Sequence, residues 1–126
     1  MRGFYRTQRD GSYVIHTVAP IAYTIPMDGT VGELMERTNI SHMRPAHIHF
    51  AVSAPGYHGL VTHLFQKGGE YLETDVVYAV KAPLIVDWVK KPAGNAPTGE
   101  TMTTPFYELK YDFVLAKRAE ALAAAE

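Results

Sequence analysis

Apolar and polar residues alternate along several stretches of the chain, and a period of two predicts β-strands with one buried face. The clearest cases are residues 46–54 (AHIHFAVSA) and 60–66 (LVTHLFQ), which the Pro55-Gly56 turn would join into a hairpin. Residues 106–115 (FYELKYDFVL) alternate in the same way and predict one long strand. The pattern therefore indicates a protein built mainly of sheet.

The N-terminal third carries strand and helix signals separated by turns. Residues 3–8 and 12–18 are aromatic and β-branched runs, and the Arg-Asp-Gly between them favours a hairpin. Pro26 and the Asp-Gly at 28–29 end that regular structure. Residues 31–38 (VGELMERT) predict two helical turns, although the glycine within them lowers the helix propensity.

The second half of the chain alternates between loops and strands. Residues 67–75 predict a loop with room for one short strand, and residues 84–89 (LIVDWV) predict another strand. Residues 92–105 are rich in proline, glycine and threonine, which is typical of a surface loop. Residues 116–126 are rich in alanine and predict a frayed helical tail.

These signals together predict the fold class. Short strands with turns at regular spacing favour an all-β fold, an antiparallel β-sandwich or barrel, with one short helix. A length of 126 residues predicts a single domain, residues 1–126, with its core in residues 2–115.

Charge and composition narrow the class of function. The chain has 12 basic and 13 acidic residues, interspersed, so it lacks the basic stripe on which nucleic-acid binding relies. It has no cysteine, which excludes disulfides and thiolate metal sites. The longest apolar run, residues 82–89, is too short to cross a membrane, and residues 1–11 lack the apolar segment of a signal peptide. We expect a soluble, cytoplasmic protein that binds neither nucleic acid nor membrane.

Two histidines stand two positions apart in the predicted strand at residues 46–54. Side chains at this spacing point to the same face of a strand, so His47 and His49 would lie side by side. Neutral imidazoles in such a pair can bind iron, zinc, copper or nickel. The alternative is a pair of half-exposed histidines on the solvent face of a sheet.

An arginine and a tyrosine strengthen the interpretation of His47 and His49 as metal ligands. Arg44 lies at the predicted start of the strand, where its planar charged group could bind an anion or simply be solvated. Tyr23 lies between Pro20 and Pro26. A free phenol has a pKa of about 10, but a trivalent cation can displace its proton and bind the hard oxygen anion. Its alternative is a half-buried aromatic at the sheet edge.

Three segments together resemble a known family. Residues 11–35, 44–65 (RPAHIHFAVSAPGYHGLVTHLF) and 71–88 resemble the intradiol ring-cleavage dioxygenases, in particular the catechol and hydroxyquinol 1,2-dioxygenases. The resemblance runs from about residue 2 to residue 88 and resumes at 107–115. The RPAHIHF stretch, with APGY and THLF behind it, is its most specific part.

The resemblance implies a non-haem ferric ion, Fe(III), held by two tyrosines and two histidines. By position, His47 and His49 match the histidine ligands, and Tyr23 matches the second tyrosine, which leaves the iron when substrate binds. Arg44 matches the arginine beside the substrate ring. His63 lies where the family commonly has a glutamine, which implies either a place beside the metal ligands or a contact with substrate.

The implied reaction inserts O2 between the two hydroxylated carbons of a catechol or hydroxyquinol. Its product would be of the muconate or the maleylacetate type, as in the catabolism of aromatic compounds. The expected partners are thus a small aromatic diol and dioxygen. We also expect a homo-oligomer, since an open sheet edge invites pairing with another chain.

One ligand of the implied iron site is not matched. The family's first tyrosine ligand would fall before Met1, as would the opening strands of the sandwich, which suggests a fragment, a wrongly placed start or one subunit of a split enzyme. Tyr5 and Tyr13 are the alternatives for this ligand within the chain.

Three hypotheses follow from these residues. The chain is the catalytic part of an intradiol dioxygenase, a metal-binding but inactive relative, or a small-molecule carrier whose histidines are structural. Together, Tyr23, Arg44, His47 and His49 favour the first hypothesis, because a carrier needs no such combination.

Overall fold

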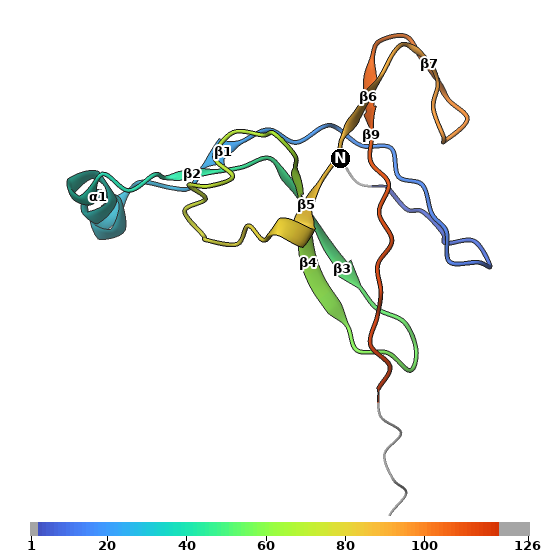
Figure 1. Ribbon diagram of the computed structural model, residues 1–126, viewed down its shortest axis with the longest axis horizontal. Coiled ribbons are helices and arrows are strands. Elements are labelled where there is room, and N and C mark those ends of the chain that lie inside the picture. The colour runs from blue at the N-terminus through green and yellow to red at the C-terminus, as the bar shows by residue number, and fades with distance from the viewer. Residues whose placement is uncertain (1–2, 119–126) are drawn as a thin grey trace, which may run out of the picture. The chain divides into compact units, whose positions relative to one another are not determined.

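The computed structural model describes residues 3–118, and these fall into two compact units (Figure 1). Unit 1 comprises Met1–Ala19 and Trp88–Leu109, and unit 2 comprises Pro20–Asp87 and Lys110–Glu126. Each unit is described separately below. The prediction of a single domain stays a prediction.

The centre of unit 2 is the predicted hairpin. Strands β3 (His47–Val52) and β4 (Leu60–Gln66) pair antiparallel over their whole length, from His47 opposite Phe65 to Val52 opposite Leu60. Between them, the amide of Tyr57 donates to the carbonyl of Ala54, and Gly56 has a φ of 80°. A side chain is disfavoured at that φ, which explains the glycine in the turn. Both predicted strands and their turn are confirmed.

One strand pair in unit 2 departs from the predicted antiparallel arrangement. Strand β5 (Ile85–Val86) runs parallel to β4. Parallel pairing needs a long connection, which here consists of residues 67–84, ending in the short 3-10 helix η1 (Ala82–Leu84). The predicted strand at 84–89 is interrupted after β5, at residues 87–88. Residues 67–75 form a loop without a strand.

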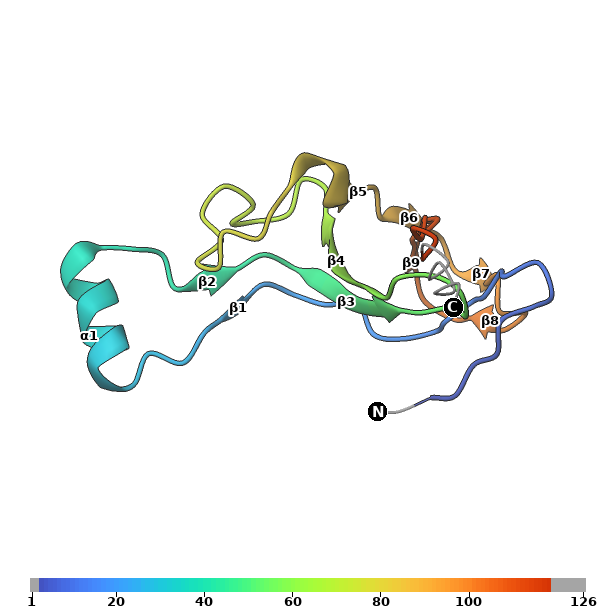
Figure 2. The same ribbon diagram turned by 90° about the horizontal axis from the view of Figure 1, so that it is seen from below.

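A second pair of strands carries the helix of unit 2. Strand β1 (Tyr23–Thr24) pairs antiparallel with β2 (Met43–Arg44), and helix α1 (Gly29–Thr38) lies between them in the chain (Figure 2). The predicted helix is confirmed and starts two residues earlier. A Cβ on Gly32 would overlap the Met27 carbonyl, so close packing explains this helical glycine.

Unit 1 contains two small antiparallel pairs. Strand β6 (Val89–Lys91) pairs with β9 (Phe106–Glu108), and β7 (Gly94–Asn95) pairs with β8 (Thr101–Met102). The predicted surface loop at 92–105 thus contains a hairpin. The carboxylate of Glu100 pairs with the ring of His16.

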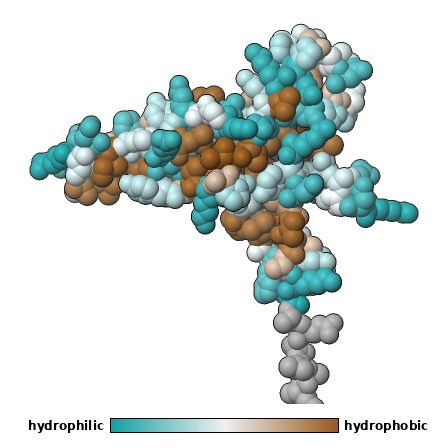
Figure 3. Space-filling view, viewed as in Figure 1, coloured by the Kyte–Doolittle hydropathy of each residue, from teal (hydrophilic) through white to brown (hydrophobic). Residues whose placement is uncertain are grey.

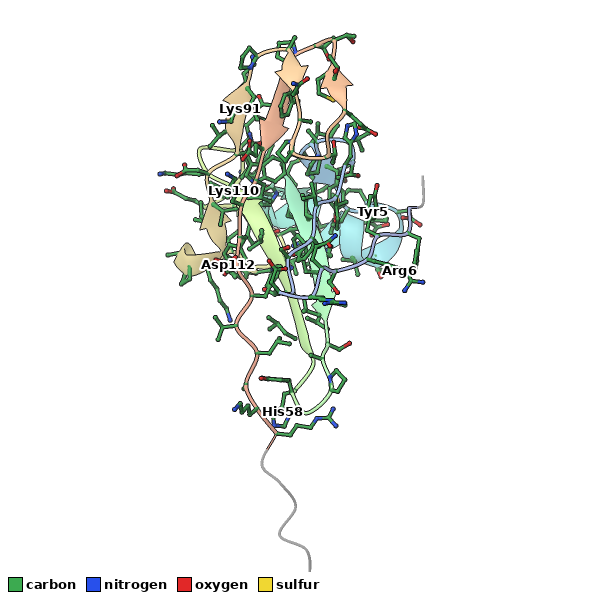
Figure 4. The ribbon with its side chains drawn as sticks, turned by 90° about the vertical axis from the view of Figure 1, so that its right-hand side faces the viewer. Tyr5, Arg6, His58, Lys91, Lys110 and Asp112 are labelled. Carbon is green, nitrogen blue, oxygen red and sulfur yellow. The ribbon has the colours of Figure 1, made fainter. Side chains whose placement is uncertain are left out.

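The strand predictions at 3–8 and 12–18 were wrong, and the one at 106–115 was wrong beyond β9. Residues 3–18 turn back at residues 8–12 as expected, where the amide of Ser12 also bonds Asp10, but their arms form no strand. Of residues 106–115 only β9 is a strand, and the extended part beyond it carries Lys110 and Asp112 (Figure 4). Alternation predicts a two-faced extended chain, but a strand also needs a neighbouring backbone to bond.

Aromatic packing explains the alternation beyond β9. The ring of Phe113 lies 4.8 Å from that of Phe50 on β3 and 4.9 Å from that of Tyr111, between ring centroids. Farther along, Lys117 forms an isolated bridge with Tyr57, so residues 116–118 are not helical. The rest of the predicted tail helix, residues 119–126, lies outside the described residues.

The buried side chains gather in unit 2. Leu64 and Phe65 on β4 are fully buried, as is Pro45, and Met35 and Ala46 complete the apolar core of the described residues. Many other apolar side chains reach the surface, among them Phe4, Ile21, Val61, Tyr78 and Val114. Brown hydrophobic patches are visible on the face drawn in Figure 3. Within residues 3–118, no helix is long and apolar enough to cross a membrane.

Candidate metal centre

The buried end of the β3–β4 hairpin carries the two predicted metal-binding histidines. Pro45 and Ala46 connect β2 to β3, and both residues are buried. His47 and His49 then point to one face of the sheet, with their Nε2 atoms 3.2 Å apart. The expected side-by-side placement of the two rings is confirmed.

Hydrogen bonding selects the form of the His47 ring. Its Nδ1–H donates to the Pro45 carbonyl at 2.7 Å, which leaves the lone pair on Nε2. Metal-binding histidines typically make such a bond with the other ring nitrogen. The His47 Nε2 atom lies 3.1 Å from Nη1 of Arg44, whose N–H can donate to it.

The surroundings of both histidines favour the neutral ring, although His49 is more exposed than His47. Burial lowers the pKa of His47; its bond to the Pro45 carbonyl opposes that shift, and the nearby charge of Arg44 adds to it. Burial also lowers the pKa of His49, and the neighbouring His63 and Arg44 lower it further. Neutral rings are the form that binds metal ions.

The spacing of the two nitrogens suits a shared metal ion. With a metal–nitrogen distance of about 2.1 Å, two nitrogens 3.2 Å apart would subtend about 100° at the metal. That angle is appropriate for neighbouring ligands of one ion. His47 and His49 therefore fit two positions of a metal centre.

Tyr23 lies beside this pair. Strand register places it opposite Arg44, its hydroxyl lies 3.5 Å from Nη1 of Arg44, and its ring centroid lies 5.6 Å from that of His47. The Tyr23 residue is 46% exposed, so solvent or a ligand can reach it. Three of the predicted donors thus occupy one neighbourhood, at the start of β3.

Arg44 is buried and paired with a carboxylate that the sequence analysis missed. Its Nε donates to Oδ1 of Asp75 at 3.1 Å, and both side chains are less than one-tenth exposed. Burial would raise the pKa of Asp75, but the bonds from Arg44 and two backbone amides outweigh it and lower the pKa. A buried arginine requires such a partner, yet nothing in the sequence distinguishes Asp75 from the other acidic residues.

His63 is the third imidazole at this end of the sheet. It lies opposite His49 on β4, with 5.2 Å between the ring centroids, and 5.8 Å separates its centroid from that of His47. Its Nε2 lies 3.4 Å from the Ala79 carbonyl, to which it can donate. His63 thus flanks the pair with one nitrogen turned to the backbone.

The composition of the donor set is specific. Across residues 3–118, no group of three or more histidine, cysteine, aspartate or glutamate side chains is placed to hold a metal ion. The oxygen and nitrogen donors that lie together at this position are the phenol of Tyr23 and the imidazoles of His47 and His49. Tyr5 and Tyr13 belong to unit 1, where the Tyr5 hydroxyl donates to the His16 carbonyl.

Comparisons with known proteins agree with this geometry. A family model described as dioxygenase matches residues 1–117. The chain belongs to this dioxygenase family. The family resemblance seen in the sequence is therefore confirmed, as is the fold class, since the similar solved structures are 1,2-dioxygenases.

Named members of the dioxygenase family lie close in sequence and structure. The 6-chlorohydroxyquinol 1,2-dioxygenase of Cupriavidus pinatubonensis is 43% identical over 114 residues, which cover 90% of this chain. The hydroxyquinol 1,2-dioxygenase of Nocardioides simplex is 43% identical over 108 residues, 85% of this chain. The solved hydroxyquinol 1,2-dioxygenase of Pseudomonas putida DLL-E4 superposes with a TM-score of 0.80 and 41% identity over 90% of this chain.

The chain matches only part of these dioxygenases. It spans 37% of the length of both curated relatives and 40% of the solved Pseudomonas chain.

Proposed function

We propose that this chain carries the iron-binding and substrate-binding residues of an intradiol dioxygenase acting on a catechol or a hydroxyquinol. The observation that supports this most is the Nε2 pair of His47 and His49, 3.2 Å apart, beside Tyr23 in a member of the dioxygenase family. The names of the relatives support the substrate class.

Each site residue would have a distinct part. His47 and His49 would hold a ferric ion through their neutral Nε2 atoms, and Tyr23 would add a negatively charged oxygen. Ferric iron bound there would supply Lewis acidity, which makes a diol easier to ionise, and the ionised diol is easier to oxidise than the neutral one.

The remaining chemistry belongs to the protein side chains. The Tyr23 oxygen would accept one proton from a hydroxyl of the diol. Arg44 would stabilise negative charge on the substrate, because its guanidinium is always protonated and held close by. His63, on the neighbouring strand, would contact the substrate ring.

The overall reaction needs no reductant other than the diol itself. The atoms of catechol and O2 add up to those of a muconic acid. The bond between the two hydroxylated carbons breaks, and each of these carbons gains one oxygen atom. A hydroxyquinol would give a maleylacetate-type product by the same insertion. The predicted homo-oligomer and cytoplasmic location stay predictions.

The decisive experiment measures the metal content and visible spectrum of the purified chain, before and after addition of catechol under argon. We expect near-stoichiometric iron and a phenolate-to-iron absorption band that shifts when catechol is added. Colourless protein that holds zinc or no metal would contradict the proposal. His58→Ala is a matched control, because His58 lies at the exposed turn of the same hairpin (Figure 4).

A second function, metal binding without turnover, is favoured by one observation. Among the described residues, the donors gathered at this site are two imidazoles and one phenol. Oxygen uptake with catechol, measured on the iron-loaded chain, separates the two functions. Uptake matched by a diacid product supports ring cleavage, whereas an intact catechol complex in air supports binding alone.

A further inference from the structure

The buried carboxylate of Asp75 accepts three hydrogen bonds from two parts of the chain. Its Oδ1 accepts from Nε of Arg44 at 3.1 Å and from the Val77 amide at 3.2 Å, while Oδ2 accepts from the Ala79 amide at 3.1 Å. Its side chain is 2% exposed. Burying an ion pair so completely adds little stability compared with apolar packing, so its geometric effect is the feature to explain.

The bond to Asp75 sets the direction of Arg44. A guanidinium is planar with five fixed donors, so anchoring Nε fixes where the two terminal nitrogens point. Nη1 then faces Tyr23 and His47. Nη2 is buried, and no hydrogen-bond acceptor for it lies among the described residues. The two N–H groups of Nη2 thus have no acceptor within residues 3–118.

The same carboxylate shapes the loop at residues 75–79. The carboxylate of Asp75 bonds the Val77 and Ala79 amides, as described above. In addition, the main-chain carbonyl of Asp75 accepts a hydrogen bond from the amide of Tyr78, whose φ is 53°. A positive φ at a non-glycine residue is costly and persists only where surrounding bonds hold it. The loop ends at the Ala79 carbonyl, which faces Nε2 of His63.

We propose that Asp75 is a positioning residue that aims Arg44 at the substrate and, through the 75–79 loop, orients His63. This inference rests on the proposed function, since it takes Arg44 and His63 as the substrate contacts. One side chain thereby couples two residues that come from different strands, β2 and β4. The substrate that Arg44 would contact in this position is one with an anionic oxygen, such as the ionised diol.

The test compares variants of the 126-residue chain, loaded with ferric iron and titrated with catechol under argon. Asp75→Asn keeps the side-chain volume and one acceptor oxygen but loses the charge and an acceptor. We expect it to weaken catechol binding about tenfold, about 1.4 kcal/mol, without changing the iron content. Asp87→Asn is the matched control, because Asp87 is exposed and pairs with Lys67 on the surface, and we expect no change.

A double variant separates positioning from a general structural role. If Asp75 acts mainly through Arg44, then Asp75→Asn lowers catechol affinity less in the Arg44→Gln background than in the native chain, and the loss that remains there reports its effect on His63. Losses that add, or native affinity in Asp75→Asn, would overturn the proposal. Arg44→Lys provides a variant that keeps a cation for Asp75 but has no planar fork, and we expect a similar tenfold loss.

A second measurement does not depend on iron or catechol. In nuclear magnetic resonance spectra of the metal-free chain, we expect the Arg44 Nε–H proton to exchange slowly with solvent, and faster in Asp75→Asn. The His63 ring signals should shift in the same variant. Equal exchange rates would overturn the positioning role. If the rates differ while the native chain binds neither iron nor catechol, the proposed function fails and the positioning role stands.

Discussion

The two ends of the β3–β4 hairpin share one hydrogen-bond ladder but differ in what surrounds them. At one end, His47 and Phe65 are paired and buried, and Arg44 and Asp75 lie close by, also buried. At the other end, Val61 is 80% exposed, and the Gly56 turn is exposed although its backbone bonds residues 116–118. Backbone pairing therefore builds the whole hairpin, but only packing at one end buries polar side chains in fixed positions.

The largest contrast should come from removing a large side chain at each end. Phe65→Ala empties a fully buried site and should lower the free energy of unfolding by about 3–5 kcal/mol. Val61→Ala removes an exposed side chain and should change it by less than about 0.5 kcal/mol. Urea denaturation of both variants measures this, and equal losses would mean that the two ends are packed alike.

Histidines at the two ends should differ in their effect on metal binding. On the proposed function, His47→Ala should lower ferric-ion affinity by about 100-fold or more. Changes to residues that only support a metal ligand already cost about 10–100-fold in affinity, and this variant removes a ligand itself. His58→Ala at the exposed turn should leave the affinity unchanged. Competition with a chelator measures both, and similar affinities in the two variants would exclude His47 as a ligand.

The buried end should also make stability depend on pH. The pKa of Asp75 is lowered in the folded chain, so its ionised form stabilises the fold fully above its unfolded pKa of about 4. That contribution is lost as the pH falls through the lower folded pKa. Urea denaturation between pH 6 and pH 2 should therefore show a steeper loss for the native chain than for Asp75→Asn, and parallel curves would argue against the shift.

The smallest effect is expected at the turn. Gly56→Ala forces a side chain into a φ of 80° and should destabilise the chain by about 1 kcal/mol. Gly59, three residues later, has an ordinary φ, and a Cβ there would only touch the Val52 carbonyl at 4.0 Å. Gly59→Ala should therefore be neutral or slightly stabilising. Equal thermal shifts would show that the turn tolerates a side chain.

Local patterns in the sequence predicted the hairpin and helix α1, because alternation and turn residues act over a few positions. The pairing of His47 with His49 followed from the same period of two. Asp75 could not be predicted in this way, since its partner lies 31 residues away and ion pairing leaves no periodic signal. The extended residues after β9 were mispredicted for a related reason, because alternation does not reveal whether a neighbouring backbone is available.

The contrast between short-range and long-range contacts also sets an order of folding. The hairpin pairs residues close in sequence, and such contacts form within microseconds, whereas the Arg44–Asp75 contact must close a loop of 31 residues. The two histidines would thus come together before the arginine is anchored. Pulsed hydrogen exchange during refolding should show the amides of β4 protected before the Ala79 amide, and simultaneous protection would contradict this order.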